Sequence, residues 1–402
     1  MKKIFFLVLI NITGILFAET LQTKQPTNYL REGPASYYNV IAALSRGVNV
    51  EVLERQGSWF RVKAFSDTGW ISENSFFQPG NAQEQNENML KGKVSSRASR
   101  AELAAAVKGF ANKYTGSNDA EDIVPSKYDA TNISKDEMEK LEHSFVIVPF
   151  KNNLNIEKPF DINLHEEEIG FGIAEKIAQQ KKLYDAPNLT RYVNSIGTYL
   201  SQFTKAYDLG FRIMILNDMQ ACAFSCPGGY IFISRALIST CRNEAELAAV
   251  IAHEMAHCIQ RHGLKELKLS TPKIHAEQSF DELDEEAGGQ SDVEKELEED
   301  AAAIYDNIIA PRLLTYELEA DQLSMIYLER AGYDPTALVS LLERINNASL
   351  SGEKQQENPY FQKNDIKKRL SSASNFCQEE SLTPDTEKQF EDRFINRTVN
   401  MQ

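Results

Sequence analysis

Apolar and polar positions follow two different periods along this chain, and the first of them fills residues 24–78. Short apolar runs there are separated by turn signals at Gly33-Pro34, Gly47, Gly57-Ser58 and Gly69. Short strands separated by turns about every 10 residues are typical of small all-β folds. The pattern therefore predicts a small all-β barrel over 24–78.

The second period is helical and dominates residues 100–347. Apolar side chains recur three or four positions apart in a first stretch made of Leu189, Tyr192, Val193, Ile196, Leu200 and Phe203. This spacing predicts the apolar face of an amphipathic helix. Strands are predicted at 211–216 and 229–234, and the pattern after them is helical almost to Asn347. The sequence thus predicts an α+β fold that is mainly helical, with a small sheet.

The first 18 residues have the layout of a secretory signal. Lys2 and Lys3 precede an apolar run that ends at Ala18, a small residue at the expected cleavage site. A single membrane anchor is the alternative, but Asn11 interrupts a run already shorter than the roughly 20 apolar residues needed to cross a bilayer. We therefore expect export to the periplasm or cell envelope, with residues 1–18 removed.

Three further stretches are polar. Residues 79–99 are predicted to be a linker, and residues 348–402 a loosely ordered tail with one short helix near 364–370. Residues 277–300 hold twelve acidic residues and one lysine. Such a run usually forms a solvated insertion, and a lid over a cleft is the sharper alternative.

The net charge of the protein limits the classes of molecule that it can bind. The chain has 43 Lys and Arg against 58 Asp and Glu, a formal net charge of -15. This balance repels nucleic acids and anionic membranes unless a local basic patch exists, and no such patch is visible in the sequence. We expect no nucleic-acid partner. Because residues 277–300 account for most of the negative charge, the acidity is largely local.

A helix is predicted from 244 to 262, with Asn243 as N-cap, Glu246 as its reciprocal partner and Gly263 as the stop. Within it, His253 and His257 are four residues apart. Two histidines at this spacing project from one face, so both imidazoles can bind one metal ion.

The residue next to the first of these histidines is Glu254, which completes an HExxH motif. A tetrahedral catalytic zinc needs a third protein ligand and an open position. Glu317 and Asp321 lie one helical turn apart further along the chain, so that one carboxylate can bind the metal while the other orients a ligand imidazole. The sequence thus predicts one Zn²⁺ per chain.

These motifs and their surroundings resemble the peptidase family that includes the CAAX prenyl proteases, the membrane protease HtpX and periplasmic proteases of outer-membrane quality control. Further matches are Glu168-Ile169-Gly170, Pro227-Gly228-Gly229, Arg261-His262 and Ala331-Gly332-Tyr333-Asp334-Pro335. The resemblance implies a zincin-type metallopeptidase domain. It also implies that misfolded or unassembled envelope proteins are the substrates.

By the same resemblance, His253, His257 and Glu317 are the zinc ligands, Glu254 is the catalytic base, and Asp321 supports a ligand. Which residue stabilises the oxyanion stays open among Tyr316, Tyr327 and His262. Of these, His262 is more simply explained as a structural residue.

The predicted strand before the metal-binding helix contains Gly229, Tyr230, Ile231 and Phe232. In proteases of this kind an edge strand at this place pairs with the extended backbone of the substrate. A purely structural strand is the alternative.

Three positions depart from the family pattern: Cys222 replaces an Asn, Leu314 replaces an Arg, and no His stands near Asn358. None of these positions is a proposed zinc ligand or base. The pair Cys222 and Cys226 is compatible with a disulfide or with buried thiols, and we favour buried thiols.

The all-β segment itself resembles the bacterial Src-homology-3-type domain, through Leu30 to Pro34, Gly57-Ser58-Trp59 and Gly69-Trp70-Ile71. The resemblance implies a recognition module for a cell-wall peptide or a protein partner. Trp59 and Trp70 are equally compatible with a peptide groove and with the core.

The residues together favour an exported zinc endopeptidase that acts on protein or peptide substrates. One alternative is a weakly proteolytic, metal-containing chaperone or scaffold of the cell envelope. Another is a hydrolase targeted to the cell wall, which only the all-β segment suggests. The intact set of His253, Glu254, His257 and Glu317 favours the protease.

Overall fold

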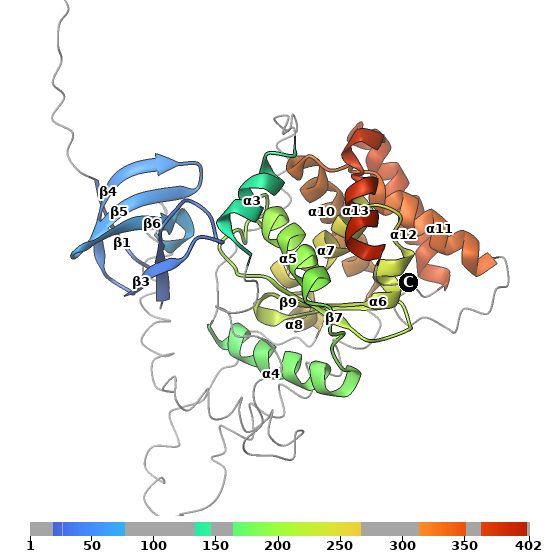
Figure 1. Cartoon of the computed structure of the whole chain (residues 1–402), viewed down its shortest axis with the longest axis horizontal. Coiled ribbons are helices and arrows are strands. Elements are labelled where there is room, and N and C mark those ends of the chain that lie inside the picture. Colours follow the sequence, from blue (N-terminus) through green and yellow to red (C-terminus); the bar gives the residue numbers. More distant parts are fainter. Residues whose placement is uncertain are drawn as a thin grey trace, which may run out of the picture. The chain divides into compact units, whose positions relative to one another are not determined.

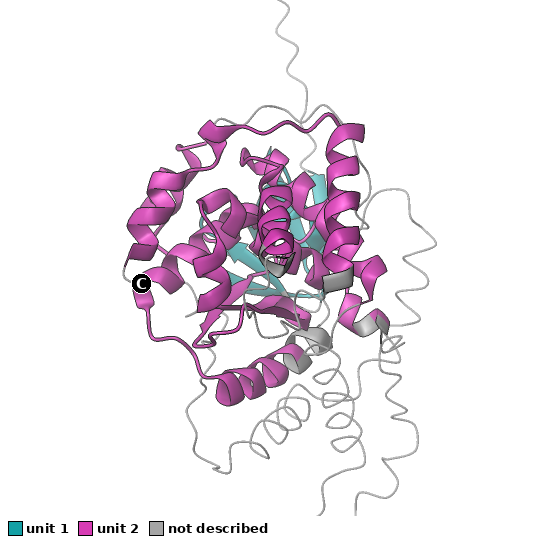
Figure 2. Cartoon of the chain, turned by 90° about the vertical axis from the view of Figure 1, so that its right-hand side faces the viewer, with its two compact units in different colours: residues 1–34, 38–80 teal, residues 35–37, 81–402 magenta. Residues whose placement is uncertain are grey.

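The computed structural model describes residues 19–25, 27–76, 133–145, 164–266, 313–350 and 363–399. The chain divides into two compact units, residues 1–34 with 38–80 and residues 35–37 with 81–402 (Figure 2). The predicted signal segment 1–18, the linker 79–99 and the acidic insertion 277–300 lie outside the described residues.

The first unit is an antiparallel sheet, which confirms the all-β prediction. Its strands are β1 (Glu19–Gln22), β2 (Thr27–Arg31), β3 (Val40–Ser45), β4 (Asn49–Gln56), β5 (Trp59–Ala64) and β6 (Asp67–Ser72), and the short 3₁₀ helix η1 (Glu73–Ser75) follows. The strand order is β1-β4-β5-β6-β2-β3. Closure of this sheet into a barrel stays a prediction.

Alternation of side chains explains the core of this unit. Along β5, Phe60, Val62 and Ala64 are buried while Arg61 and Lys63 are exposed, because successive side chains of a strand point to opposite faces. Of the two tryptophans, Trp59 is buried in the core and Trp70 is half-buried. Strand β1 lies before the predicted boundary at residue 24 and pairs with β4.

The second unit is mainly helical. Its described helices are α3 (Lys135–Glu142), α4 (Leu164–Lys181), α5 (Pro187–Ser201), α6 (Arg235–Thr240), α7 (Glu244–Ile259), α8 (His262–Glu266), α10 (Leu314–Ala331), α11 (Ala337–Leu350), α12 (Lys363–Glu379) and α13 (Glu391–Thr398). The 3₁₀ helices η2 (Pro227–Gly229) and η3 (Thr386–Lys388) add short turns. Among the described helices, none has the length and hydropathy of a membrane span.

A three-stranded sheet completes this unit and confirms the predicted mixture of helices and a small sheet. Its strands are β7 (Arg212–Leu216), β8 (Ala223–Cys226) and β9 (Tyr230–Ser234), in the order β7-β9-β8. Strand β9 runs parallel to β7 and antiparallel to β8. The sheet lies between α4 on one side and α5 and α7 on the other (Figure 1).

Helix α7 is the centre of the core. Every residue from Glu244 to Ile259 is buried, and α5, α10 and α11 pack around it. A helix that is buried on all sides tolerates few polar residues. The polar side chains that α7 does carry therefore need partners or a function.

The start of α7 follows the predicted cap with one difference. The side chain of Asn243 accepts a hydrogen bond from the backbone N–H of Glu246 at 2.9 Å. Glu246 does not return a bond to Asn243; its carboxylate accepts from the backbone N–H of Arg242 and binds Arg344. The cap thus also ties α7 to α11.

The end of α7 differs from the prediction of a stop at Gly263. The helix ends at Ile259, and Arg261 adopts a left-handed backbone conformation with φ of 54°. This turn starts α8 at His262. His262 therefore lies on a separate helix from His253 and points in a direction that a continuous helix would not give it.

The prediction of a loosely ordered tail after residue 347 is wrong for the described residues. Helix α12 has 17 residues and buries Ile366, Arg369, Ala373 and Phe376. These residues recur three or four positions apart, and the polar residues between them lower the overall hydropathy of the segment. Helix α13 follows and buries Phe394.

Helix α13 is held to the start of α7 by a buried carboxylate. Glu244 accepts hydrogen bonds from the hydroxyls of Tyr192 and Tyr333, each at 2.7 Å, and pairs with Arg393 of α13. Burial and the Glu244 charge raise the pKa of both tyrosines, which stay neutral donors.

Removal of the Arg393 side chain should destabilise this unit. We expect Arg393→Ala to lower the free energy of unfolding by about 3 kcal/mol, because it leaves a buried carboxylate without its cation. Denaturant unfolding measures the effect, and Arg242→Ala is the matched control because Arg242 is exposed. Equal stability of the two variants would contradict this account of Glu244.

Candidate active site

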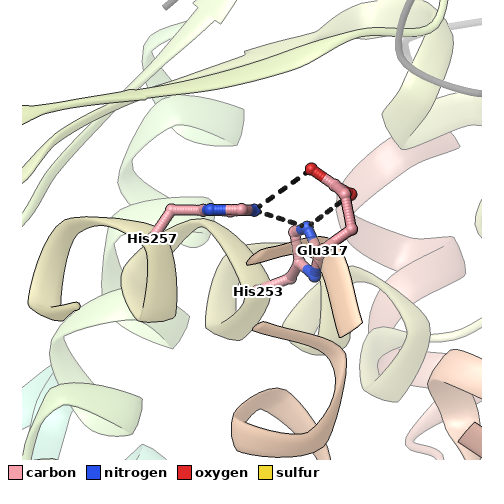
Figure 3. A group of neighbouring side chains, drawn as sticks. All are labelled: His253, His257 and Glu317. Carbon is pink, nitrogen blue, oxygen red and sulfur yellow. Dashed lines mark hydrogen bonds and ion pairs between the residues drawn. The ribbon is translucent and has the colours of Figure 1, made fainter. Parts of the chain in front are cut away.

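Helices α7 and α10 bring three potential metal ligands together. The Nε2 atoms of His253 and His257 lie 3.0 Å apart, and each lies 3.4 Å from a carboxylate oxygen of Glu317 (Figure 3). All the ligand atoms lie within 4.8 Å of one another. The structure thus assembles the three residues that the sequence singled out as zinc ligands.

The spacing of these atoms fits a tetrahedral zinc site. Zinc binds imidazole nitrogen and carboxylate oxygen at about 2.0–2.2 Å, so two ligand atoms of a tetrahedral site lie about 3.3 Å apart. The two Nε2 atoms are 3.0 Å apart, and each lies 3.4 Å from its nearest oxygen of Glu317, Oε2 for His253 and Oε1 for His257, so all three separations are close to this value. Three protein ligands leave a fourth position open, as catalytic zinc sites require.

Asp321 stands directly behind one ligand. Its Oδ1 lies 3.0 Å from Nδ1 of His253, on the side of the ring away from the cluster. Asp321 is 1% exposed and is itself held by Arg369 of α12, at 2.9 Å from Nε and 2.7 Å from Nη2. The two carboxylates predicted to act together are therefore one turn apart on α10, each contacting His253.

Arg369 is a site residue that the sequence analysis missed. Its Nη1 lies 2.7 Å from a carboxylate oxygen of Glu317, and its other nitrogens bind Asp321. The side chain is 4% exposed. Its helical spacing with Ile366 and Ala373 marks it as inward-facing, but no local pattern identifies carboxylates on α10 as its partners.

The charges of the site explain the direction of its pKa shifts. Burial raises the pKa of Glu317 and Asp321, but Arg369 and the imidazoles outweigh it and hold both pKa values below the ordinary range. Burial lowers the pKa of His257. For His253, hydrogen bonding to Asp321 and Glu317 overcomes burial and raises the pKa to about 9.

Glu254 is the remaining predicted catalytic residue. It follows His253 on α7, is 2% exposed, and lies close enough for its charge to act on His257 and Cys222. A carboxylate this buried is costly unless it is paired or has a function. Its place beside the metal cluster suits a group that accepts and returns a proton.

The prediction of an edge strand at Gly229, Tyr230, Ile231 and Phe232 is wrong. Strand β9 is the central strand, with β7 on one side and β8 on the other, so its backbone has no free edge. Within the described residues, β8 has β9 as its sole strand neighbour. Strand β7 is the other edge of the sheet, and its backbone bonds to residues 182–184. Strand β8 was not predicted by the sequence analysis.

The turn between β8 and β9 is fixed by glycines. Gly228 and Gly229 have φ of 75° and 86°, a region that side chains disfavour. On α4, a Cβ added to Gly170 would lie 1.8 Å from the carbonyl oxygen of Pro227. Glycine at these positions therefore permits the close packing of α4 under this turn.

The three oxyanion candidates lie in different places. Tyr327 is fully buried in the hydrophobic core. Tyr316 stacks on His262 with ring centroids 4.4 Å apart, and His262 lies 2.8 Å from His257. His262 thus contacts the ligand His257 on the side of its ring away from His253 and Glu317, Tyr316 contacts His262, and the oxyanion role stays a prediction.

The departures from the family pattern leave the metal cluster intact. Cys222, Cys226 and Cys258 are buried free thiols, and burial raises the pKa of Cys222 to about 11. The thiol of Cys258 donates to the carbonyl oxygen of Cys226 at 3.1 Å. Leu314 is the first residue of α10, and Asn358 lies outside the described residues.

Comparison with known proteins places this site in a family. The sequence model of peptidase family M48 matches residues 187–379, and that of the bacterial SH3 domain matches residues 27–77. A beta-barrel assembly-enhancing protease of Escherichia coli strain K12 is 27% identical over 189 residues, which are 45% of this chain and 37% of the relative.

Two further relatives have similar coverage. The beta-barrel assembly-enhancing protease of Yersinia pestis is 30% identical over 182 residues, 44% of this chain and 37% of the relative. The mitochondrial metalloendopeptidase OMA1 of Schizosaccharomyces pombe is 28% identical over 159 residues, 40% of this chain and 44% of the relative. The chain therefore spans less than half the length of each of these relatives.

The matched segment 187–379 contains α7, α10 and Arg369 of α12, and so the whole metal cluster and its supports. Residues 187–379 therefore form a peptidase domain of family M48, a family of zinc-dependent metallopeptidases, and residues 27–77 form a bacterial SH3 domain.

Proposed function

We propose that this chain is an exported, zinc-dependent endopeptidase that hydrolyses peptide bonds in misfolded or unassembled proteins of the cell envelope. The observation that carries the proposal is the cluster of His253, His257 and Glu317, whose ligand atoms lie within 4.8 Å of one another, with the two Nε2 atoms 3.0 Å apart. Glu254 lies next to this cluster on the same helix.

The residues of the site divide the chemistry between them. When bound, Zn²⁺ lowers the pKa of a coordinated water and polarises the scissile carbonyl group. Glu254 accepts the proton of the attacking water and delivers it to the leaving amine. Asp321 orients His253, and Arg369 keeps Glu317 and Asp321 ionised.

Strand β8 offers a binding mode for the substrate. An extended peptide that adds to the edge of a sheet is held by main-chain hydrogen bonds, with specificity left to side-chain pockets. This mode suits unfolded chains of varied sequence, because folded proteins rarely present a free strand. The edge at Ala223–Cys226 leads directly into the turn that precedes β9.

Two observations support the cell envelope as the place of action. The first 18 residues have the layout of a secretory signal. Bacterial relatives carry the name beta-barrel assembly-enhancing protease. The bacterial SH3 domain would then bind a cell-wall peptide or a protein partner and bring the peptidase unit to its site.

Proteolysis of an unfolded protein tests the proposal. We expect the purified full chain to cleave casein, to lose this activity when a chelator removes the metal, and to regain it when Zn²⁺ is added back. A tightly folded protein of similar size should be cleaved far more slowly. Casein cleavage that persists after complete removal of zinc would contradict the proposal.

A further inference from the structure

The imidazole of His257 has a second polar contact, on the side away from the metal cluster. Its Nε2 faces His253 and Glu317, whereas its Nδ1 lies 2.8 Å from Nδ1 of His262. The two rings meet at 77°, with centroids 4.9 Å apart. His262 is fully buried and is the first residue of α8, placed there by the turn at Arg261.

Helix α10 holds His262 from two further sides. The ring of Tyr316 stacks on it with an interplanar angle of 17°. The Nε2 of His262 lies 3.4 Å from Oε2 of Glu319, whose side chain is 36% exposed. A chain of polar groups thus runs from the buried metal cluster through His262 to a carboxylate at the surface.

The positions of the protons in this series of hydrogen bonds follow from the chemistry of imidazole. If His257 gives the lone pair of Nε2 to a metal, its remaining proton is on Nδ1. That N–H donates to His262, so Nδ1 of His262 is an acceptor and its proton is on Nε2. This second N–H points at Glu319, which accepts as a carboxylate. In this single arrangement of protons, every donor from His257 to Glu319 faces an acceptor.

We propose that His262 is a positioning residue, which fixes the tautomer and ring orientation of His257 and is itself oriented by Glu319. The inference rests on the proposed zinc site. The two ligand imidazoles are then supported differently, His253 by a carboxylate directly and His257 through a second imidazole. Partners that orient ligand imidazoles strengthen metal binding about 10- to 100-fold.

A matched pair of variants separates this role from simple packing. Leu and Asn have the same number and branching of side-chain heavy atoms, but only the amide oxygen of Asn can accept a hydrogen bond near the position of Nδ1. We expect His262→Leu to weaken zinc binding about 10- to 100-fold. His262→Asn should bind zinc within a few-fold of the wild type.

Competition with a chromogenic chelator gives the zinc affinities, and the visible spectrum of the Co²⁺-loaded proteins reports the geometry of the ligands. The spectrum of His262→Asn should match that of the wild type, and the spectrum of His262→Leu should differ. Equal zinc affinity of His262→Leu and the wild type would overturn the inference, as would equal losses in both variants.

Glu319 provides a second test at a position where folding is not at risk. Glu319→Leu should weaken zinc binding about 10-fold, and Glu319→Gln, which keeps an acceptor oxygen, should weaken it less. Unchanged zinc affinity in Glu319→Leu would overturn the inference that Glu319 orients His262. A wild type that binds no zinc would overturn the proposed function as well, so the two failures are distinguishable.

Discussion

Replacement of Glu254 with Gln should lower kcat for casein cleavage by a factor of about 10²–10⁴, the contribution that a positioned acid–base group makes. Gln has the shape of Glu but cannot accept the proton of the attacking water. The variant should retain its zinc and its stability, because Glu254 follows a ligand without belonging to the ligand set. Cleavage rates and zinc content of the same preparation measure both expectations.

Glu343→Gln is the matched control, because Glu343 is an exposed residue of α11 and its amide should leave kcat unchanged. If Glu254→Gln cleaves casein at the rate of the wild type, another group is the base. If Glu254→Gln abolishes cleavage but preserves the function of the protein in cells, the chaperone or scaffold alternative gains support.

Removal of the Arg369 guanidinium should have the largest effect on stability. In chelator-treated protein, Arg369→Leu should lower the free energy of unfolding by about 3–5 kcal/mol, because it leaves Glu317 and Asp321 buried without their cation. Bound zinc should offset part of the loss, because it supplies positive charge to Glu317. Denaturant unfolding with and without zinc measures both values.

Lys368→Leu is the control for this variant. Lys368 is the neighbouring residue on α12, its side chain is 63% exposed, and its ion pair with Asp365 lies at the surface. Surface pairs of this kind contribute at most about 1 kcal/mol. A loss in Arg369→Leu no larger than in Lys368→Leu would show that Arg369 does not hold the two carboxylates.

Local patterns predicted the parts of this protein whose causes are local. The spacing of His253 and His257 identified the metal-binding helix, because residues four apart share a helix face. The same rule placed Glu317 and Asp321 together on α10. Asn243 was correctly identified as the N-cap, since capping depends on residues only three positions apart.

The parts that were missed depend on contacts between distant segments. Arg369 is far from Asp321 in the sequence, so no local pattern links the two residues. The many polar residues of α12 also made the buried face of this helix hard to recognise. Strand β8 was missed because it has only four residues, and without it β9 was taken for an edge. The role of His262 depends on the left-handed turn at Arg261. Because glycine is the usual residue in that conformation, an arginine gave no local sign of the turn.

The most direct test of the central claim is an anomalous difference map, measured across the zinc absorption edge from crystals of Glu254→Gln grown with zinc. We predict one strong peak per chain, about 2.0–2.2 Å from Nε2 of His253, Nε2 of His257 and a carboxylate oxygen of Glu317. A peak at the thiols of Cys222 or Cys258, or no peak near these three residues, would contradict the zinc site and the mechanism built on it.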